Sequence, residues 1–138
     1  MKTKEQITDF IEKQKVAFIA SVDSDGFPNI KAMLMPRKLD GNCFYFTTNT
    51  SSMRVSQYRE NKKASIYFFK KGRFRYEGVM LIGTMEVLED AETKQDIWRT
   101  GDKMFYKKGV TDPDYCVLRF AAIKGRHYCD LKTESFDF

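Results

Sequence analysis

The chain has little cysteine, histidine or tryptophan and no long apolar run. Its 138 residues include three cysteines, one histidine and one tryptophan. Cys43, Cys116 and Cys129 are odd in number and lack a C-x-x-C spacing, which favours reduced, structural thiols. The lone His127 has no ligand partners at metal-site spacing, so a zinc or di-iron role is not expected. No stretch approaches the roughly 20 apolar residues of a membrane-spanning helix.

The first residues also lack the apolar core of a signal peptide. A length of 138 residues suits one domain with a substantial core. We therefore expect a single cytoplasmic domain over residues 1–138.

The charge balance is mildly basic. Lys and Arg number 24, Asp and Glu 19, and the net charge of +5 is spread without a long basic block. Such a charge suits an anionic small molecule as well as a nucleic acid and decides neither. Aromatic residues make up 14% of the chain; they favour strands and are enriched where a surface is buried against a partner, which gives weak support for a dimer.

Periodicity and turn residues predict a mainly β domain with three helices. Thr3 and Gln6 fit a capping box at the first helix. Short connections favour an antiparallel barrel of six or seven strands over alternating βαβ units. The expected helices cover 3–14, 51–61 and 89–100, and the expected strands cover 16–22, 29–37, 43–48, 64–69, 77–88, 115–123 and 126–131.

The sequence also gives expectations for two glycines, for the C-terminal tail and for the last strand. Gly83 is expected to mark a bulge in its strand. Lys124 and Gly125 are expected to form a turn, and the tail 132–138 to fray or to dock on a partner. In the last strand a packed Tyr128 and an exposed His127 are expected, because neighbouring residues of a strand face opposite sides.

The segment from Thr47 to Arg54 is the most informative part of the sequence. It joins a strand-like run to a helix-like run, crowds hydroxyl groups at the helix start, and has no Asp or Glu between Gly41 and Arg59. A helix N-terminus carries about half a positive charge, so its first turn usually prefers acids. Arg54 there is locally unfavourable unless an anion binds at the same place. The segment Thr47–Arg54 is therefore predicted to bind a phosphate group, and we call it the phosphate cradle. The alternative is that Thr50 or Ser51 merely caps the helix and Arg54 points into water.

Four stretches in order resemble a known family. They are Pro28-x-x-Lys31 with the following Ala32–Met35, Phe46-x-Thr48-Asn49-x-x-Ser52-x-Arg54, Gly78–Gly83, and Trp98 with Phe105, Gly109 and Asp112–Tyr115. Together they are similar to the FMN-binding split barrel of the pyridoxamine 5′-phosphate oxidase superfamily, in particular its general stress protein branch. The resemblance covers nearly the whole chain and implies a six-stranded antiparallel split β-barrel, mainly β with helices.

This resemblance implies FMN bound at a homodimer interface. Lys31 and Arg54 would hold the phosphate, in place of the family's Arg and Lys, with Ser52 and Thr48 nearby. Two cations and a helix terminus suit a terminal phosphomonoester, whereas a diphosphate usually comes with a glycine-rich turn, and G-x-G-x-x-G is absent. The full set of expected cofactor-binding residues is Lys31, Ala32, Met33, Leu34, Thr47, Thr48, Ser52, Met53 and Arg54. Taken alone, Lys31 could also be a solvated strand charge.

Three departures separate the chain from the oxidases. The glutamine that approaches the flavin ring falls on Gly78, the Tyr-Trp-Asp motif becomes Tyr128-Cys129-Asp130, and the C-terminal Arg-His-Arg motif has no counterpart. Oxidation of pyridoxamine phosphate itself is therefore not expected, and no catalytic residue is assigned.

Four functions remain open from the sequence. The first is an FMN-dependent oxidoreductase of unknown substrate, in which the hydride chemistry belongs to the cofactor. The second is a split barrel that uses a deazaflavin or haem, and the third is a non-catalytic flavin carrier or redox-sensing stress protein. The fourth is a single-stranded nucleic-acid platform on the basic and aromatic stretch Phe68–Tyr76, the least favoured of the four. A membrane partner is not expected.

Overall fold

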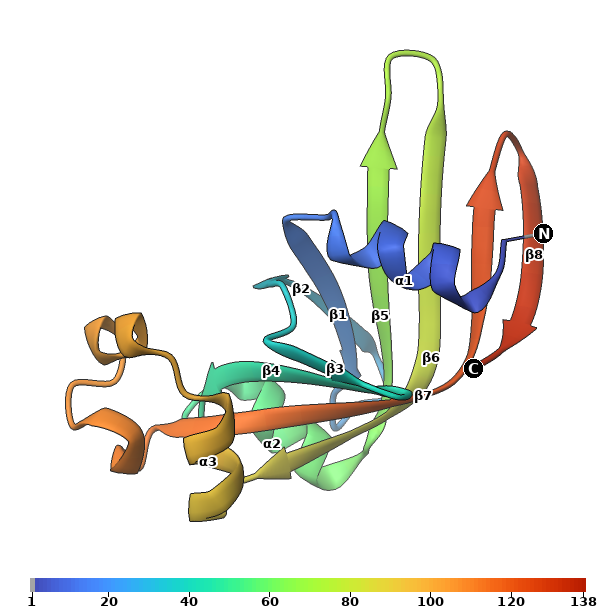
Figure 1. Ribbon diagram of the computed structural model, residues 1–138. Helices are drawn as coiled ribbons and strands as arrows, with labels where there is room; N and C mark the ends of the chain where they lie inside the picture. Colours follow the sequence, from blue (N-terminus) through green and yellow to red (C-terminus); the bar gives the residue numbers. More distant parts are fainter. Residues whose placement is uncertain (1) are drawn as a thin grey trace.

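A computed structural model describes residues 2–138, which form one open antiparallel sheet with three α-helices (Figure 1). The sheet has eight strands in the order β2-β1-β5-β6-β7-β4-β3, with β8 paired to β7. The strands are β1 (Val16–Val22), β2 (Pro28–Leu34), β3 (Lys38–Asp40), β4 (Cys43–Asn49), β5 (Lys63–Lys71), β6 (Tyr76–Leu88), β7 (Tyr115–Cys129) and β8 (Lys132–Asp137). The helices are α1 (Lys4–Glu12), α2 (Met53–Glu60) and α3 (Ala91–Ile97), followed by the short 3-10 helices η1 (Thr100–Met104) and η2 (Gly109–Thr111).

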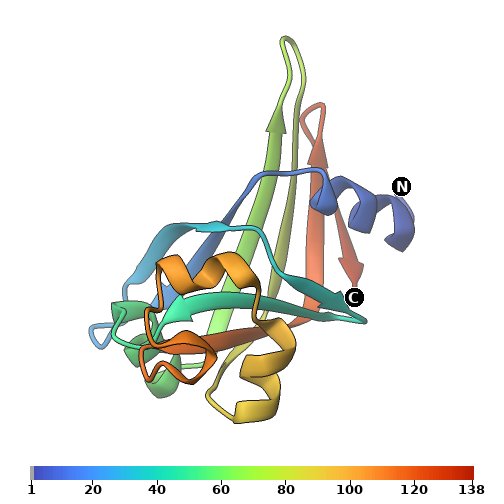
Figure 2. The ribbon, with the colours of Figure 1, turned by 60° about the vertical axis from the view of Figure 1, so that its left-hand side comes forward.

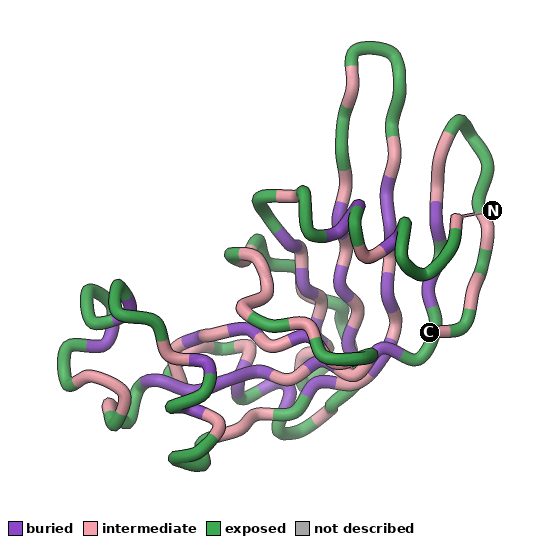
Figure 3. Tube along the Cα trace, viewed as in Figure 1, coloured by how far each residue is buried: buried purple, intermediate pink, exposed green. Residues whose placement is uncertain are grey.

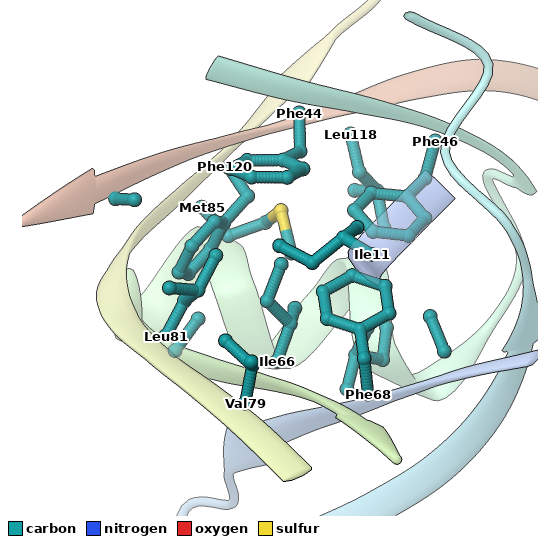
Figure 4. Packing of buried hydrophobic residues seen from close by; sticks show 14 of the residues in the cluster. Ile11, Phe44, Phe46, Ile66, Phe68, Val79, Leu81, Met85, Leu118 and Phe120 are labelled. Carbon is teal, nitrogen blue, oxygen red and sulfur yellow. The ribbon is translucent and has the colours of Figure 1, made fainter. Parts of the chain in front are cut away.

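The sheet curls around one aromatic core. Alternate residues of each strand face inward, so buried and half-buried positions alternate along β1, β4 and β5 (Figure 3). Phe44, Phe46, Phe68 and Phe120 meet there and are all at most 1% exposed. Helix α1 packs against this cluster, and its Ile11 lies among the rings (Figure 4). The mainly β fold with three α-helices predicted from the sequence is confirmed, with eight strands where six or seven were expected.

The prediction of a turn at Gly125 was wrong. Strand β7 runs unbroken through this glycine, and the tail that was expected to fray or to dock on a partner forms strand β8. Gly125 is needed because a Cβ atom there would lie 2.4 Å from the ring of Phe136, which packs across it. The turn comes at Asp130 and Leu131, whose φ angles of 51° and 66° are both positive, as in the type I′ turns that close two-residue hairpins.

Other element boundaries in the structure also differ from the predicted ones. The predicted strand 29–37 ends at Leu34, two residues before Pro36, and a new short strand β3 follows. The predicted helix 89–100 ends at Ile97. His127 was predicted to be exposed but is buried at 8% exposure, because it pairs with Val79 on the inner face of the sheet. Tyr128, predicted to be packed, is half-buried. The capping box of Thr3 and Gln6 is confirmed.

No helix within residues 2–138 combines the length and apolar character required to cross a membrane.

Gly83 marks the predicted bulge, since the register between β6 and β7 shifts between Ile82 and Gly83. A Cβ atom at Gly83 would lie 1.9 Å from the carbonyl oxygen of Ala121. We expect Gly83→Ala to lower the free energy of unfolding by about 1–3 kcal/mol, because backbone atoms must move apart. Gly101→Ala is the control, as a Cβ atom there meets nothing within 4 Å. Thermal unfolding of both variants tests this, and equal melting temperatures would contradict it.

Candidate functional site

A cavity of about 490 Å³ opens where β2 and β4 end beside the start of α2. One wall comes from the two strands, the second from α2, and the third from the segment around η1. The lining residues are Ala32, Met33, Leu34, Arg37, Thr47, Thr48, Asn49, Arg54, Asp102, Phe105, Tyr106 and Asp114. The cavity therefore combines an apolar strand surface with a polar helix terminus, as small-molecule sites commonly do.

The start of α2 presents unused hydrogen-bond donors. Ser52 is the N-cap residue, where Thr50 or Ser51 was the sequence alternative, and its side chain makes no capping hydrogen bond. Its Oγ atom is buried and has no partner within residues 2–138. The backbone N–H groups of Met53 and Arg54 belong to the first turn, where no intrahelical acceptor exists. These groups and the helix dipole together favour an anion.

Arg54 supplies a cation at the same place. Its Nη2 atom donates to Oγ1 of Thr48 at 2.9 Å. Its Nε atom is buried and has no partner in the described part of the chain. Buried donors without a partner are rare and costly in folded proteins. A guanidinium held by one hydroxyl, with Nε still free, is consistent with a site built for an anionic ligand.

Asp114 also reaches the start of α2, which the sequence analysis missed. Its Oδ1 atom accepts a hydrogen bond from the N–H of Ser51 at 2.8 Å, and its carbonyl oxygen accepts from the N–H of Thr50 at 2.7 Å. The acid absent from the local sequence is thus supplied by a distant loop. Because Asp114 uses the donors just before the helix, an anion has the N–H groups of Met53 and Arg54 left to bind.

A buried ion pair holds the third wall. Arg37 donates from Nη1 and Nη2 to the two carboxylate oxygens of Asp102, at 2.8 and 2.6 Å. Asp102 also accepts from the N–H of Arg99 at 2.9 Å. The hydrogen bond from Arg37 holds the pKa of Asp102 below its ordinary value, and burial opposes this shift. Nothing in the spacing of two residues 65 positions apart indicated this pair.

Two aromatic residues follow η1 at the cavity. Tyr106 packs on Trp98 and Tyr115, and burial raises the pKa of its hydroxyl to about 12. It therefore stays protonated at neutral pH and can donate a hydrogen bond but not act as a base. Phe105 remains 70% exposed although it lines the cavity. Its free ring surface is available to a planar ligand.

Six of the nine predicted cofactor-binding residues line the cavity: Ala32, Met33, Leu34, Thr47, Thr48 and Arg54. Ser52 lies at the adjoining helix start. Met53 is 72% exposed, so its contribution would be its backbone N–H. Lys31 is exposed on β2 and does not line the cavity. Its role toward a phosphate stays a prediction.

Comparisons with known proteins found a matching family and several similar structures. Residues 3–129 match the family described as pyridoxamine 5′-phosphate oxidase. A protein from Clostridium acetobutylicum related to general stress protein 26 of Bacillus subtilis superposes with a TM-score of 0.86 at 36% identity, over 97% of this chain and 93% of that one. General stress protein 26 of Bacillus anthracis gives a TM-score of 0.76 at 18% identity, over 98% of each chain, which shows the fold alone.

Among curated proteins, the pyridoxine/pyridoxamine 5′-phosphate oxidase of Rhizobium leguminosarum bv. trifolii is 38% identical over 74 residues. This match covers 54% of the chain and only 34% of the oxidase. A haem-binding protein of Mycobacterium smegmatis shares the fold, with a TM-score of 0.73 at 15% identity over 93% of this chain and 55% of that one.

Proposed function

Because the chain belongs to the pyridoxamine 5′-phosphate oxidase family, we propose that its cavity binds FMN and that the protein is an FMN-dependent oxidoreductase. The observation that carries the proposal is that Ser52 Oγ and Arg54 Nε, at the start of α2, are buried and find no hydrogen-bond partner among residues 2–138. A terminal phosphate offers several acceptor oxygens to these groups and to the N–H groups of the first turn.

The remaining cavity residues suit the rest of such a ligand. Thr47 and Thr48 offer hydroxyl groups beside the cradle, and the Ala32–Leu34 segment offers an extended backbone and apolar side chains for a planar ring. When bound, FMN supplies the capacity to accept and pass on a hydride. The chain positions the ring and limits the access of water. No side chain in the cavity stands out as a required acid or base, since Asp102 is tied to Arg37, Asp114 accepts from the N–H of Ser51, and Tyr106 stays protonated.

The histidine does not favour haem. His127 Nε2 lies 2.6 Å from the Glu77 carboxylate, on the inner face of the sheet and away from the cavity. A histidine engaged in this way is not free to bind iron at the proposed site. Flavin is therefore the cofactor that the described residues support best.

A second copy of the chain would complete the site. The outer face of β1, β2, β5 and β6 carries an apolar groove of about 380 Å³ lined by Phe18, Ile19, Ala20, Ile30, Ser65, Ile66, Tyr67 and Met80. Ile30 is 74% exposed, and Leu34, four residues further along β2, is 69% exposed and lines the cavity. Continuous apolar surface of this kind commonly marks a protein interface. A homodimer over this face would cover the groove and the cavity mouth together.

The test is reconstitution of the purified protein with FMN. We expect a flavin absorbance spectrum, release of one FMN per chain on denaturation, and a light-scattering mass of two chains for the loaded protein. A protein that takes up no FMN in a titration would refute the cofactor assignment. A loaded protein with the mass of one chain would refute the dimer and leave the cofactor assignment standing.

A further inference from the structure

The glycine at position 78 leaves room for the side chain of Tyr67. Gly78 lies on β6, which runs next to β5 in both ribbon views (Figures 1 and 2). A Cβ atom at Gly78 would lie 2.1 Å from the hydroxyl oxygen of Tyr67 and 2.7 Å from the ring carbon that bears it. The three atoms nearest to such a Cβ atom all belong to Tyr67. No side chain can therefore occupy position 78 while the Tyr67 ring lies in this place.

Neighbouring rings hold Tyr67 across this glycine. Tyr67 stacks on Phe69, with ring centres 6.3 Å apart and planes inclined by 13°, and Phe69 stacks on Tyr76 at 5.9 Å and 20°. Phe18 on β1 pairs with Tyr67 from the other side. Among residues 2–138, no hydrogen bond engages the Tyr67 hydroxyl group. Packing thus fixes the ring, and the hydroxyl group keeps its full capacity for hydrogen bonding.

The Tyr67 ring shares one surface with the apolar edge of the cavity. Ala32 lines the cavity and pairs with Phe18 in register, and Phe18 pairs with Tyr67. Residues paired in this way point to the same side of a sheet, here the outer face that carries the apolar groove. Neither Tyr67 nor Gly78 lines the cavity of its own chain. In a two-fold homodimer over this face, the cavity mouth of each protomer would lie against the Tyr67 region of the other.

We propose that the Tyr67 hydroxyl donates a hydrogen bond to the flavin ring held by the other protomer, in the space that a glutamine side chain fills in the oxidases. This inference rests on the proposed FMN-binding homodimer. The oxidases' glutamine that approaches the flavin falls on Gly78, and the geometry puts a hydroxyl group from the neighbouring strand at that position. A phenol and a primary amide both donate hydrogen bonds, so one can replace the other.

The Tyr67 hydroxyl group is suited to act as a donor. Burial raises its pKa, and the nearby phenols of Tyr76 and Tyr128 raise it further. The group therefore keeps its proton at neutral pH. A donor at the flavin ring stabilises the reduced flavin more than the oxidised one, because reduction adds electron density to the ring. Tyr67 would thus both hold the ring and raise its reduction potential.

The test compares Tyr67→Phe with the wild type in fluorescence titrations of FMN and riboflavin. The variant keeps the ring and its stacking and loses only the hydroxyl group. Both ligands should bind about three- to ten-fold more weakly, which corresponds to the loss of one neutral hydrogen bond. The midpoint reduction potential of bound FMN should also fall. Tyr45→Phe is the matched control, because Tyr45 lines neither the cavity nor the groove, and it should change none of these values.

A second pair of variants tests the exchange with glutamine. Tyr67→Ala removes the ring, and Tyr67→Ala with Gly78→Gln supplies an amide in the space that the ring leaves. The double variant should bind riboflavin more tightly than Tyr67→Ala. Gly78→Gln alone should lower the melting temperature, because the Tyr67 ring must then move. A double variant that binds riboflavin no better than Tyr67→Ala would contradict the exchange.

The outcomes separate this inference from the proposed function. Wild-type protein that takes up no FMN refutes both. If the wild type binds FMN, and Tyr67→Phe changes neither the affinities nor the potential, only the role of Tyr67 is overturned. Equal losses in Tyr67→Phe and Tyr45→Phe would overturn it as well. So would an FMN-loaded protein with the mass of one chain, because Tyr67 does not line the cavity of its own chain.

Discussion

Replacing Arg54 by alanine is expected to weaken FMN binding about 100-fold while the protein stays folded. The guanidinium donates one hydrogen bond to Thr48, and its buried Nε atom has no partner in the part of the chain that the structure describes. Two charge-assisted hydrogen bonds to a phosphate contribute roughly 3 kcal/mol together, which corresponds to the stated loss. The core does not depend on this side chain, because Arg54 lies outside the cluster that packs beneath α2.

A fluorescence titration with FMN measures this effect, and riboflavin provides the sharpest comparison. Riboflavin lacks the phosphate, so wild-type protein and Arg54→Ala should bind it with similar affinity. Arg59→Ala serves as the control on the same helix, since Arg59 is exposed and pairs with Glu89 at 2.7 Å. If Arg54→Ala weakened riboflavin and FMN equally, the phosphate would not lie at Arg54. If it weakened neither, the cradle would be misplaced altogether.

How far the sequence predicts this site depends on how local each contribution is. The hydroxyl-rich turn and Arg54 lie within eight residues of each other. The partial positive charge and free N–H groups of a helix N-terminus were enough to identify them as an anion site. Ala32–Leu34 came from the resemblance, and the structure places them at the same cavity. Asp114 and the pair of Arg37 and Asp102 were missed, because only tertiary folding brings them to the cavity and neither has a local pattern.

The fold prediction also succeeded where the sequence signal was local and failed where tertiary packing decided the structure. Strands with clear inward alternation, such as β1 and β4, were predicted closely. The error at Gly125 arose because glycine serves turns and close packing alike, and sequence alone does not tell which. Here the ring of Phe136 decides, and the true turn uses two non-glycine residues, Asp130 and Leu131, with positive φ. Non-glycine residues in that conformation are uncommon, so the sequence signal for the turn was weak.

The largest loss of stability is expected from breaking the ion pair of Arg37 and Asp102. Their side chains are 12% and 4% exposed, so Arg37→Ala leaves a buried carboxylate without its partner. Such a loss costs about 3–5 kcal/mol, or a fall of roughly 10–20 °C in Tm. The control is Lys38→Ala, which breaks the exposed pair with Asp96 and should cost less than about 1 kcal/mol. Differential scanning calorimetry distinguishes the two, and equal losses would contradict the assignment.

The pH dependence of stability provides an independent test of the same pair. The pKa of Asp102 lies below its ordinary value of 3.8 in the folded protein, chiefly because Arg37 donates to its carboxylate. The stabilisation is therefore complete above that value and is lost as the pH falls through the lower folded pKa. Asp102→Asn should be less stable than the wild type at neutral pH, and the difference should shrink on acidification.

Replacing both partners by apolar residues, Arg37→Met with Asp102→Leu, should recover most of the lost stability, because it removes the unpaired buried charge and not only the attraction. A double variant as unstable as the single ones would mean that the wall of the cavity depends on this pair for its shape, and FMN affinity should then fall with it.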